Sequence, residues 1–240
     1  MDWFSYLASG LGVYVAIAVF TLGMAWRIYE WSRTPKTAVR LALYPKPKTG
    51  LGRFGKLLKD TLLAPQSVAI ATSVMLAAFA FHFAALAAFV GHLRLVHEFT
   101  PLVALLGEDG MNAFAGWSGG IAGIVMLLAV LYWIVRRTYG AYRKLSTPED
   151  YLLLALLLGI VVMGDHLRFV GELHAGTYQV WFASLMAFKP AFPPELAASS
   201  TRLALNWHML FVDAFLIYFP FSKMTHAVGA FATNLVRSSD

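Results

Sequence analysis

The chain contains 240 residues, of which 59% are apolar and only 13% are charged, and its formal net charge is +6. An average soluble domain carries roughly 25% charged residues, so a soluble fold and a disordered chain are both nearly excluded and an integral membrane protein is indicated. Cysteine is absent, so any metal site must use histidine, methionine or carboxylate ligands.

Five apolar stretches reach the roughly 20 residues that a bilayer crossing needs. We expect them near residues 6–26, 67–91, 113–135, 151–171 and 203–222. The predicted fold is an all-α integral membrane bundle of five transmembrane helices, forming one domain over 1–240 with a basic cytoplasmic loop at 27–66. No Lys or Arg precedes the first stretch, which is long enough to span, so we do not expect a cleavable signal there.

The basic residues gather on one side of this predicted bundle. Nine lie in 27–66, four in 136–144 and two near the C-terminal end, whereas the opposite side has only Arg94, Arg168, Lys189 and Arg202. Because cytoplasmic loops are enriched in Lys and Arg, we predict an outside N-terminus and a cytoplasmic C-terminus in a cytoplasmic (inner) membrane. Topology accounts for the basic charge, and no nucleic-acid partner is expected.

The basic loop becomes amphipathic near its end. Prolines and glycines interrupt residues 44–53, and an amphipathic pattern then runs from Phe54 to Leu63. This segment is either a docking surface for anionic lipid or a partner subunit, or a positive-inside loop with no further role.

Histidines are the most informative polar residues within the predicted spans, because ionisable groups in a membrane are costly and mark function by default. Span two carries His82 and His92, and span five carries His208 and His226. Matching by depth pairs His82 with His226 and His92 with His208. Each pair could clamp one iron porphyrin between two helices, so two b haems are predicted.

The spacing of these histidines supports this pairing only in part. His208 and His226 are 18 residues apart and share a helix face, whereas His82 and His92 are 10 apart and differ by roughly 80° around the axis. The corresponding rises, about 27 Å and about 15 Å, also differ. Helix tilt and a kink at Pro220 could absorb part of this difference.

Three stretches resemble the gamma-subunit family of respiratory nitrate reductases. They are Ala78–His92 followed by Phe99-Thr-Pro101, Met111–Gly120, and Trp207–His226 with its Phe-Pro-Phe-Ser run. The resemblance covers most of the chain. It implies a dihaem cytochrome b that exchanges electrons with the quinone pool, with His82 and His226 as the cytoplasm-proximal haem ligands and His92 and His208 as the distal ones.

The same superfamily contains the cytochromes b of Dsr-type (sulfite-reduction-associated) complexes and of membrane-bound heterodisulfide reductase. Three departures favour these: a longer 27–66 loop, two added residues between His92 and Thr100, and the acidic Glu108 and Asp109. The resemblance then implies oxidation of menaquinol near the outer face and electron transfer to a cytoplasmic iron–sulfur partner of the Dsr-type, heterodisulfide-reductase-like kind. The alternatives are a nitrate reductase gamma subunit and, in another class, a haem-free membrane anchor or transporter.

Quinol oxidation needs hydrogen-bond partners for two hydroxyls and a route for protons. The outer ends of spans two and four supply the candidates, with Gly91 leaving room for a ring: Arg94, His97, Glu98, Asp165, His166 and Glu172. His166 could instead replace a haem ligand or be structural, and His97 and His174 are more often structural. Arg94 and Arg202 could neutralise haem propionates or anchor the interface. Segments 92–96 and 166–170 look alike, but we do not expect a repeat.

Two further features of the spans have more than one interpretation. Asp213 lies deep in span five, five residues after His208 and on a different face, where it could bond a neighbouring helix or serve proton movement. Several glycines near the start of span three indicate close helix packing or room for a haem: Gly116, Gly119, Gly120 and Gly123.

Overall fold

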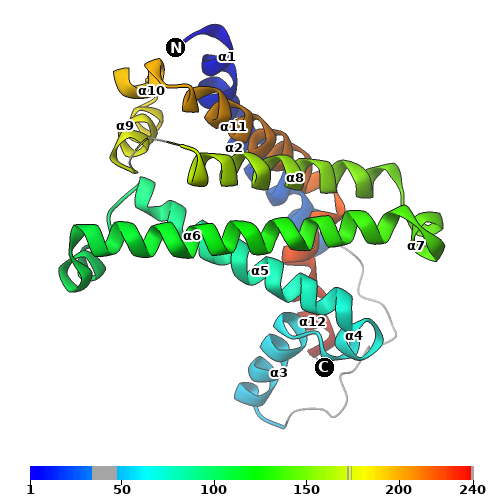
Figure 1. Ribbon diagram of the computed structural model, residues 1–240. Coiled ribbons are helices and arrows are strands. Elements are labelled where there is room, and N and C mark those ends of the chain that lie inside the picture. The colour runs from blue at the N-terminus through cyan, green and yellow to red at the C-terminus, as the bar shows by residue number, and fades with distance from the viewer. Residues whose placement is uncertain (34–47, 172, 174, 239–240) are drawn as a thin grey trace. The chain divides into compact units, whose positions relative to one another are not determined.

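The computed structural model describes residues 1–33, 48–171, 173 and 175–238, and every regular element in these residues is a helix (Figure 1). Within the described residues, five helical stretches are long and apolar enough to cross a membrane: Trp3–Ser32, Thr72–Leu95, Thr100–Thr138, Pro148–Phe169 and Thr201–Phe221. The predicted all-α, five-span architecture is therefore confirmed. The predicted orientation of the termini stays a prediction.

The chain forms two compact units, which are described separately. The first comprises Met1–Ala18 and Ala77–Ile217, and the second comprises Val19–Leu76 and Tyr218–Asp240. The expectation of a single domain stays a prediction. Part of the expected basic loop, residues 34–47, and the candidates Glu172 and His174 lie outside the described residues.

The first span is not a uniform α-helix. It begins as α1 (Trp3–Tyr6), continues as the π-helical η1 (Leu7–Leu11) and then becomes α2 (Gly12–Ser32). The Asp2 carboxylate caps the start by accepting a hydrogen bond from the Ser5 amide at 2.7 Å. A π-helical turn has a wider backbone than an α-helical one and often accompanies a functional site.

The second and third spans meet through a short connection. Helix α5 (Thr72–His92) ends in the 3₁₀ turn η2 (Leu93–Leu95), and α6 (Thr100–Thr138) follows. Helix α6 is longer than the expected 113–135, because Pro101 starts a helical segment before Gly107. Gly107 breaks the helix with a φ of 73°, a conformation that glycine adopts without steric cost.

The fourth span begins at a well-defined cap. Helix α7 (Gly140–Leu145) precedes α8 (Pro148–Phe169), where Thr147 and Asp150 form a reciprocal capping box and Pro148 occupies the first turn.

The remaining elements include two short helices that the sequence did not predict. These are α9 (Ala175–Met186) and α10 (Pro194–Ala198), which precede α11 (Thr201–Tyr218). Pro220 ends α11, and the 3₁₀ turns η3 (Phe219–Phe221) and η4 (Lys223–Thr225) lead into α12 (His226–Ser238).

Two apolar clusters hold the first unit together. Phe81 of α5, Val130 of α6 and Leu154 of α8 form one, and α6 and α8 run side by side along it (Figure 1). Trp181 and Leu185 of α9, Leu196 of α10 and Leu205 of α11 form the other. The unpredicted helices therefore cover one end of the first unit.

The second unit contains α3 (Gly50–Leu62) and α4 (Pro65–Ile70). The amphipathic pattern at residues 54–63 falls largely within α3, which begins after its Thr49 cap. Asn234 of α12 donates a hydrogen bond to the Thr61 hydroxyl of α3 at 3.0 Å, and Arg27 of α2 donates to the Pro220 carbonyl at 2.9 Å. Whether α3 docks lipid or a partner stays a prediction.

Candidate functional site

The four predicted haem ligands share one structural feature: the Nδ1 atom of each imidazole contacts a backbone carbonyl oxygen. A carbonyl can only accept, so Nδ1 must carry the proton and Nε2 the lone pair. The four contacts are His82 to Ala78 at 2.7 Å, His92 to Ala88 at 2.6 Å, His208 to Ile160 at 3.0 Å and His226 to Lys223 at 2.9 Å.

This arrangement fits the donor chemistry that an iron porphyrin requires. Metal-bound histidines almost always donate their other ring N–H to a carbonyl, a carboxylate or water, which fixes the tautomer and orients the ring. His97 and His166 are exposed and make no such contact with the described residues. The contact between Nδ1 and a backbone carbonyl therefore distinguishes the four predicted ligands from His97 and His166, the two other described histidines.

Helix α5 orients its own two histidines. His82 and His92 each bond the carbonyl of the residue four positions earlier, Ala78 and Ala88, and both side chains are exposed within the described residues. Each ring thus lies along its helix, one turn back toward the N-terminus, as helical side chains tend to do.

A neighbouring helix orients His208. The Ile160 carbonyl that contacts its Nδ1 belongs to α8, whereas His208 belongs to α11. One turn along α8, a Cβ at Gly164 would lie 3.2 Å from His208 Cε1, so the glycine leaves room for the ring. The sequence did not predict the roles of Ile160 and Gly164. Every residue has a backbone carbonyl, so the side chain of Ile160 does not indicate this contact, and a glycine in a membrane span has several possible roles.

The two predicted haem-ligand pairs differ in how their members are divided between the units. His92 and His208 both belong to the first unit, and their pairing stays a prediction. His82 lies in the first unit and His226 in the second. The pairing of His82 with His226 stays a prediction.

The Arg94 side chain is engaged in a bidentate ion pair. Its Nε and Nη2 atoms donate to the Glu98 carboxylate at 2.7 and 2.9 Å, and Nη2 also reaches Asn112 at 3.1 Å. The hydrogen bond from Arg94 lowers the pKa of the Glu98 carboxyl below its ordinary value. Gln179 of α9 donates to the Arg94 carbonyl at 2.8 Å, so this cluster joins η2 to α6 and α9.

Span four packs its polar end against glycines of α6. A Cβ at Gly123 would overlap the Asp165 carboxyl, and one at Gly119 would lie 3.0 Å from the Arg168 guanidinium. Arg168 also donates to the Ala115 carbonyl at 2.7 Å. These contacts favour helix packing as the role of Gly119 and Gly123, and Phe169 contacts Gly120 in the same way. Gly91 and Gly116 instead face open space, with no described atom within 4 Å of an added Cβ.

Arg202 anchors the start of α11. It donates to the Ala197 carbonyl of α10 at 2.9 Å and lies 3.5 Å from the Asp2 carboxylate. Its predicted role toward a haem propionate stays a prediction.

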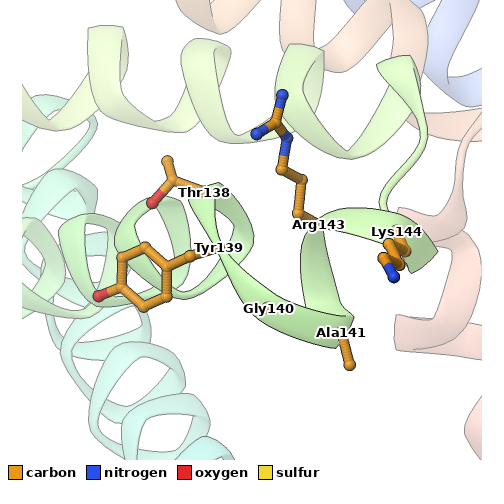
Figure 2. Close-up of a pocket in the computed structure, with 6 residues that line it drawn as sticks. All are labelled: Thr138, Tyr139, Gly140, Ala141, Arg143 and Lys144. Atoms are coloured by element: carbon orange, nitrogen blue, oxygen red, sulfur yellow. The ribbon is translucent and has the colours of Figure 1, made fainter.

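A surface pocket lies away from all of these residues. Figure 2 shows it at the junction of α6 and α7, where Arg143 extends toward the neighbouring helix, and its six lining residues are Thr138, Tyr139, Gly140, Ala141, Arg143 and Lys144. None of the predicted site residues lines it.

Comparison with known proteins gives the family of this chain. Residues 66–239, which include all four histidines, match the family described as "Nitrate reductase gamma subunit". The chain belongs to the nitrate reductase gamma-subunit family. It is also 28% identical to an "Hdr-like menaquinol oxidoreductase cytochrome b-like subunit" of Archaeoglobus fulgidus, over 91% of this chain and 75% of the relative. A protein of the same description from Archaeoglobus profundus is 23% identical, over 90% of this chain and 74% of the relative.

Proposed function

We propose that this gamma-subunit family member is the dihaem b, quinone-reactive electron-transfer subunit of a membrane-bound respiratory oxidoreductase. The observation that carries the proposal is the Nδ1 contact shared by His82, His92, His208 and His226. Membership of the family and the "cytochrome b-like" description of two relatives support it.

Two pairs of histidines would hold the haems. His82 and His226 would bind the b haem nearer the cytoplasm, and His92 and His208 the one nearer the outer face. Bound haem supplies reversible one-electron chemistry. The chain itself fixes the tautomer of each ligand through a backbone carbonyl, which also increases the basicity of Nε2.

Menaquinol is the proposed electron donor, oxidised near the outer face at the ends of spans two and four. The description of the two relatives as menaquinol oxidoreductase subunits supports this choice of quinone. His97 and His166 are exposed imidazoles that can accept quinol protons, and Asp165 lies beside His166 in the chain. Gly91 leaves open space for a ring to approach the backbone, and Arg94 holds η2 beside it.

The proposed acceptor is a cytoplasmic iron–sulfur subunit of a heterodisulfide-reductase-like, Dsr-type complex. The chain itself would have no terminal catalytic site and would lie in the cytoplasmic (inner) membrane. The family match favours a second candidate, the iron–sulfur beta subunit of nitrate reductase. Membranes in which menaquinol has reduced the haem distinguish these two partners. Reoxidation of the haem by an added heterodisulfide supports the heterodisulfide-reductase-like partner, and reoxidation by nitrate supports the nitrate reductase beta subunit.

The first test is haem quantitation with a reduced-minus-oxidised spectrum on the purified chain. We expect two b haems in the wild type. His92→Ala and His208→Ala should lose the same haem, and His82→Ala and His226→Ala should lose the other. His166→Ala is the matched control, because its exposed ring has no carbonyl contact with the described residues; it should keep both haems.

Each other outcome contradicts a defined part of the proposal. A single haem would mean that one pair is wrong, and loss of a haem in His166→Ala would make that residue a ligand. A folded protein that contains no haem, although it was expressed with haem in excess, would contradict electron transfer and favour a membrane anchor or transporter.

The quinol site needs a separate measurement. We expect menaquinol-driven haem reduction to slow in Arg94→Ala, His97→Ala or His166→Ala, while dithionite still reduces both haems fully. Unchanged rates in all three variants would remove this site from the proposal.

A further inference from the structure

A buried chain of polar side chains links the first span to α11. Ser9 Oγ donates to Asn206 Oδ1 at 2.7 Å, and Asn206 Nδ2 donates to Ser5 Oγ at 2.8 Å. Trp181 of α9 donates to the Ser9 carbonyl at 3.0 Å. Ser5 and Ser9 are fully buried and Asn206 is 1% exposed. These polar groups lie within a membrane protein's interior and belong to none of the sites described above.

Asp213 lies on the same face of α11 as Asn206. The two residues are seven apart, which is close to two helical turns. Asp213 is only 4% exposed, and neither carboxyl oxygen has a hydrogen-bond partner among the described residues. An ionised carboxylate buried in this way would lose its hydration without compensation. A protonated, neutral carboxyl group avoids this cost.

The first span is shaped to receive this carboxyl group. A Cβ at Gly12 would lie 2.5 Å from Asp213 Oδ2 and 2.5 Å from the Leu7 carbonyl oxygen. Gly12 follows directly after the π-helical turn Leu7–Leu11, and its amide donates to the Leu7 carbonyl. The absent side chain and the wider turn thus leave a space at the point where Asp213 meets the first span.

Helix α8, which also packs on α11, directs its own acidic side chain toward a different helix. Helix α8 meets α11 where Gly159 contacts Phe211 and Gly164 contacts His208, and Asp165 of α8 faces Gly123 of α6. From the first span, Gly12 faces the Asp213 carboxyl group. No cation among the described residues therefore offsets a charge on Asp213.

We propose that Asp213 is a proton-binding site within the membrane and that the Ser5–Asn206–Ser9 chain is the route by which this proton exchanges with the side where the first span begins. The site is separate from the histidines and from the quinol candidates. It does not rest on the proposed function, because the carboxyl group, the π-helical turn and the polar chain are present whether or not haem binds.

Infrared spectroscopy of the full-length purified protein tests the first half of the proposal. A protonated carboxylic acid gives a carbonyl band that a carboxylate lacks, and this band shifts in deuterium oxide. We expect the wild type to show such a band and Asp213→Asn to lose it. Asn is isosteric and neutral, so this variant should fold as the wild type does. Absence of the band in the wild type, or its full retention in Asp213→Asn, would overturn the proposal.

A second pair of variants keeps the test decisive if Asp213→Asn folds poorly. Gly12→Ala places a Cβ against the carboxyl group and should shift the frequency of the band. Gly116→Ala is the matched control, because this helical glycine of a span has no described atom within 4 Å of an added Cβ. An equal effect in both variants would contradict the assignment of the band to Asp213.

The exchange route has its own readout. Ser9→Ala removes the hydroxyl that bonds Asn206 and should slow the deuterium shift of the band without removing the band. Leu203→Ala, an exposed position on the same helix, should leave the exchange rate unchanged. Exchange as fast in Ser9→Ala as in the wild type would remove the polar chain from the proposal.

Discussion

Substitution of Gly164 by alanine is the most direct perturbation of the contact between α8 and the predicted ligand His208. The new Cβ would lie 3.2 Å from His208 Cε1 and 3.5 Å from Nδ1, closer than most side-chain contacts. The imidazole must therefore move by a few tenths of an ångström. That movement lengthens or bends the 3.0 Å contact between Nδ1 and the Ile160 carbonyl, which fixes the tautomer of the ring.

The magnitude follows from the size of the overlap. Inserting one methyl group into a packed site costs typically about 1–3 kcal/mol, and the 3.2 Å contact with a single ring atom places Gly164→Ala near the lower end. A loss of about 1 kcal/mol in the binding of the haem that we propose His208 holds corresponds to about a fivefold lower affinity. A valine at the same position, with two further methyl groups, should abolish that binding.

The assay is titration of the haem-depleted protein with haem, followed by a spectrum of each redox state. We expect Gly164→Ala to weaken one of two haem sites and to leave the other unchanged, and Gly116→Ala to leave both unchanged. If Gly164→Val binds two haems with wild-type affinity, then either His208 is not a ligand or α8 does not orient it.

Two further predictions concern stability. Arg94 holds the pKa of Glu98 below its ordinary value of 4.5, so the ion pair stabilises the fold at pH values above 4.5 and loses this contribution as the pH falls through the lowered pKa. The difference in thermal midpoint between the wild type and Glu98→Gln should therefore be largest near neutral pH and vanish in acid. A difference that is independent of pH would contradict this prediction. Leu196→Ala should lower the free energy of unfolding by about 2–5 kcal/mol, because this side chain is fully buried between α9 and α11. Leu203→Ala is the control, since this position is 57% exposed, and it should lower the free energy of unfolding far less. Equal denaturation midpoints for the two variants would refute the packing argument.

The spans were predictable from sequence because the bilayer imposes a single dominant rule, a sufficient length of apolar residues. All five predicted stretches lie within or overlap the observed helices. Helix α9 was not predicted, since its twelve residues are too short to span and carry polar side chains such as Gln179. The long start of α6 was missed for a related reason: Glu108, Asp109 and Gly107 interrupt its apolar pattern, although the backbone remains helical on both sides of Gly107.

The candidate site was predictable only to the level of side-chain type. Histidines at matching depths on two spans predicted the four candidate ligands, but the atoms that orient their rings are backbone carbonyls, which every residue has. For His208 that carbonyl belongs to Ile160, 48 residues away in sequence. No pattern within one helix contains this contact. It depends on how α8 and α11 pack, which in turn depends on glycines at positions 159 and 164.

The similar segments that begin at His92 and His166 show why local sequence alone does not assign a role. Arg94 pairs with the Glu98 side chain four residues later, whereas Arg168 donates to a carbonyl of α6. The His92 ring bonds the carbonyl one turn earlier within α5. His166 uses its own carbonyl to accept the Val170 amide at the end of α8, at 2.9 Å. The same residues at two helix ends therefore have different partners, because η2 turns toward α6 and α9 while α8 ends against the glycines of α6. A ligand role transferred from His92 to His166 on sequence likeness would lack the carbonyl contact that all four predicted ligands share.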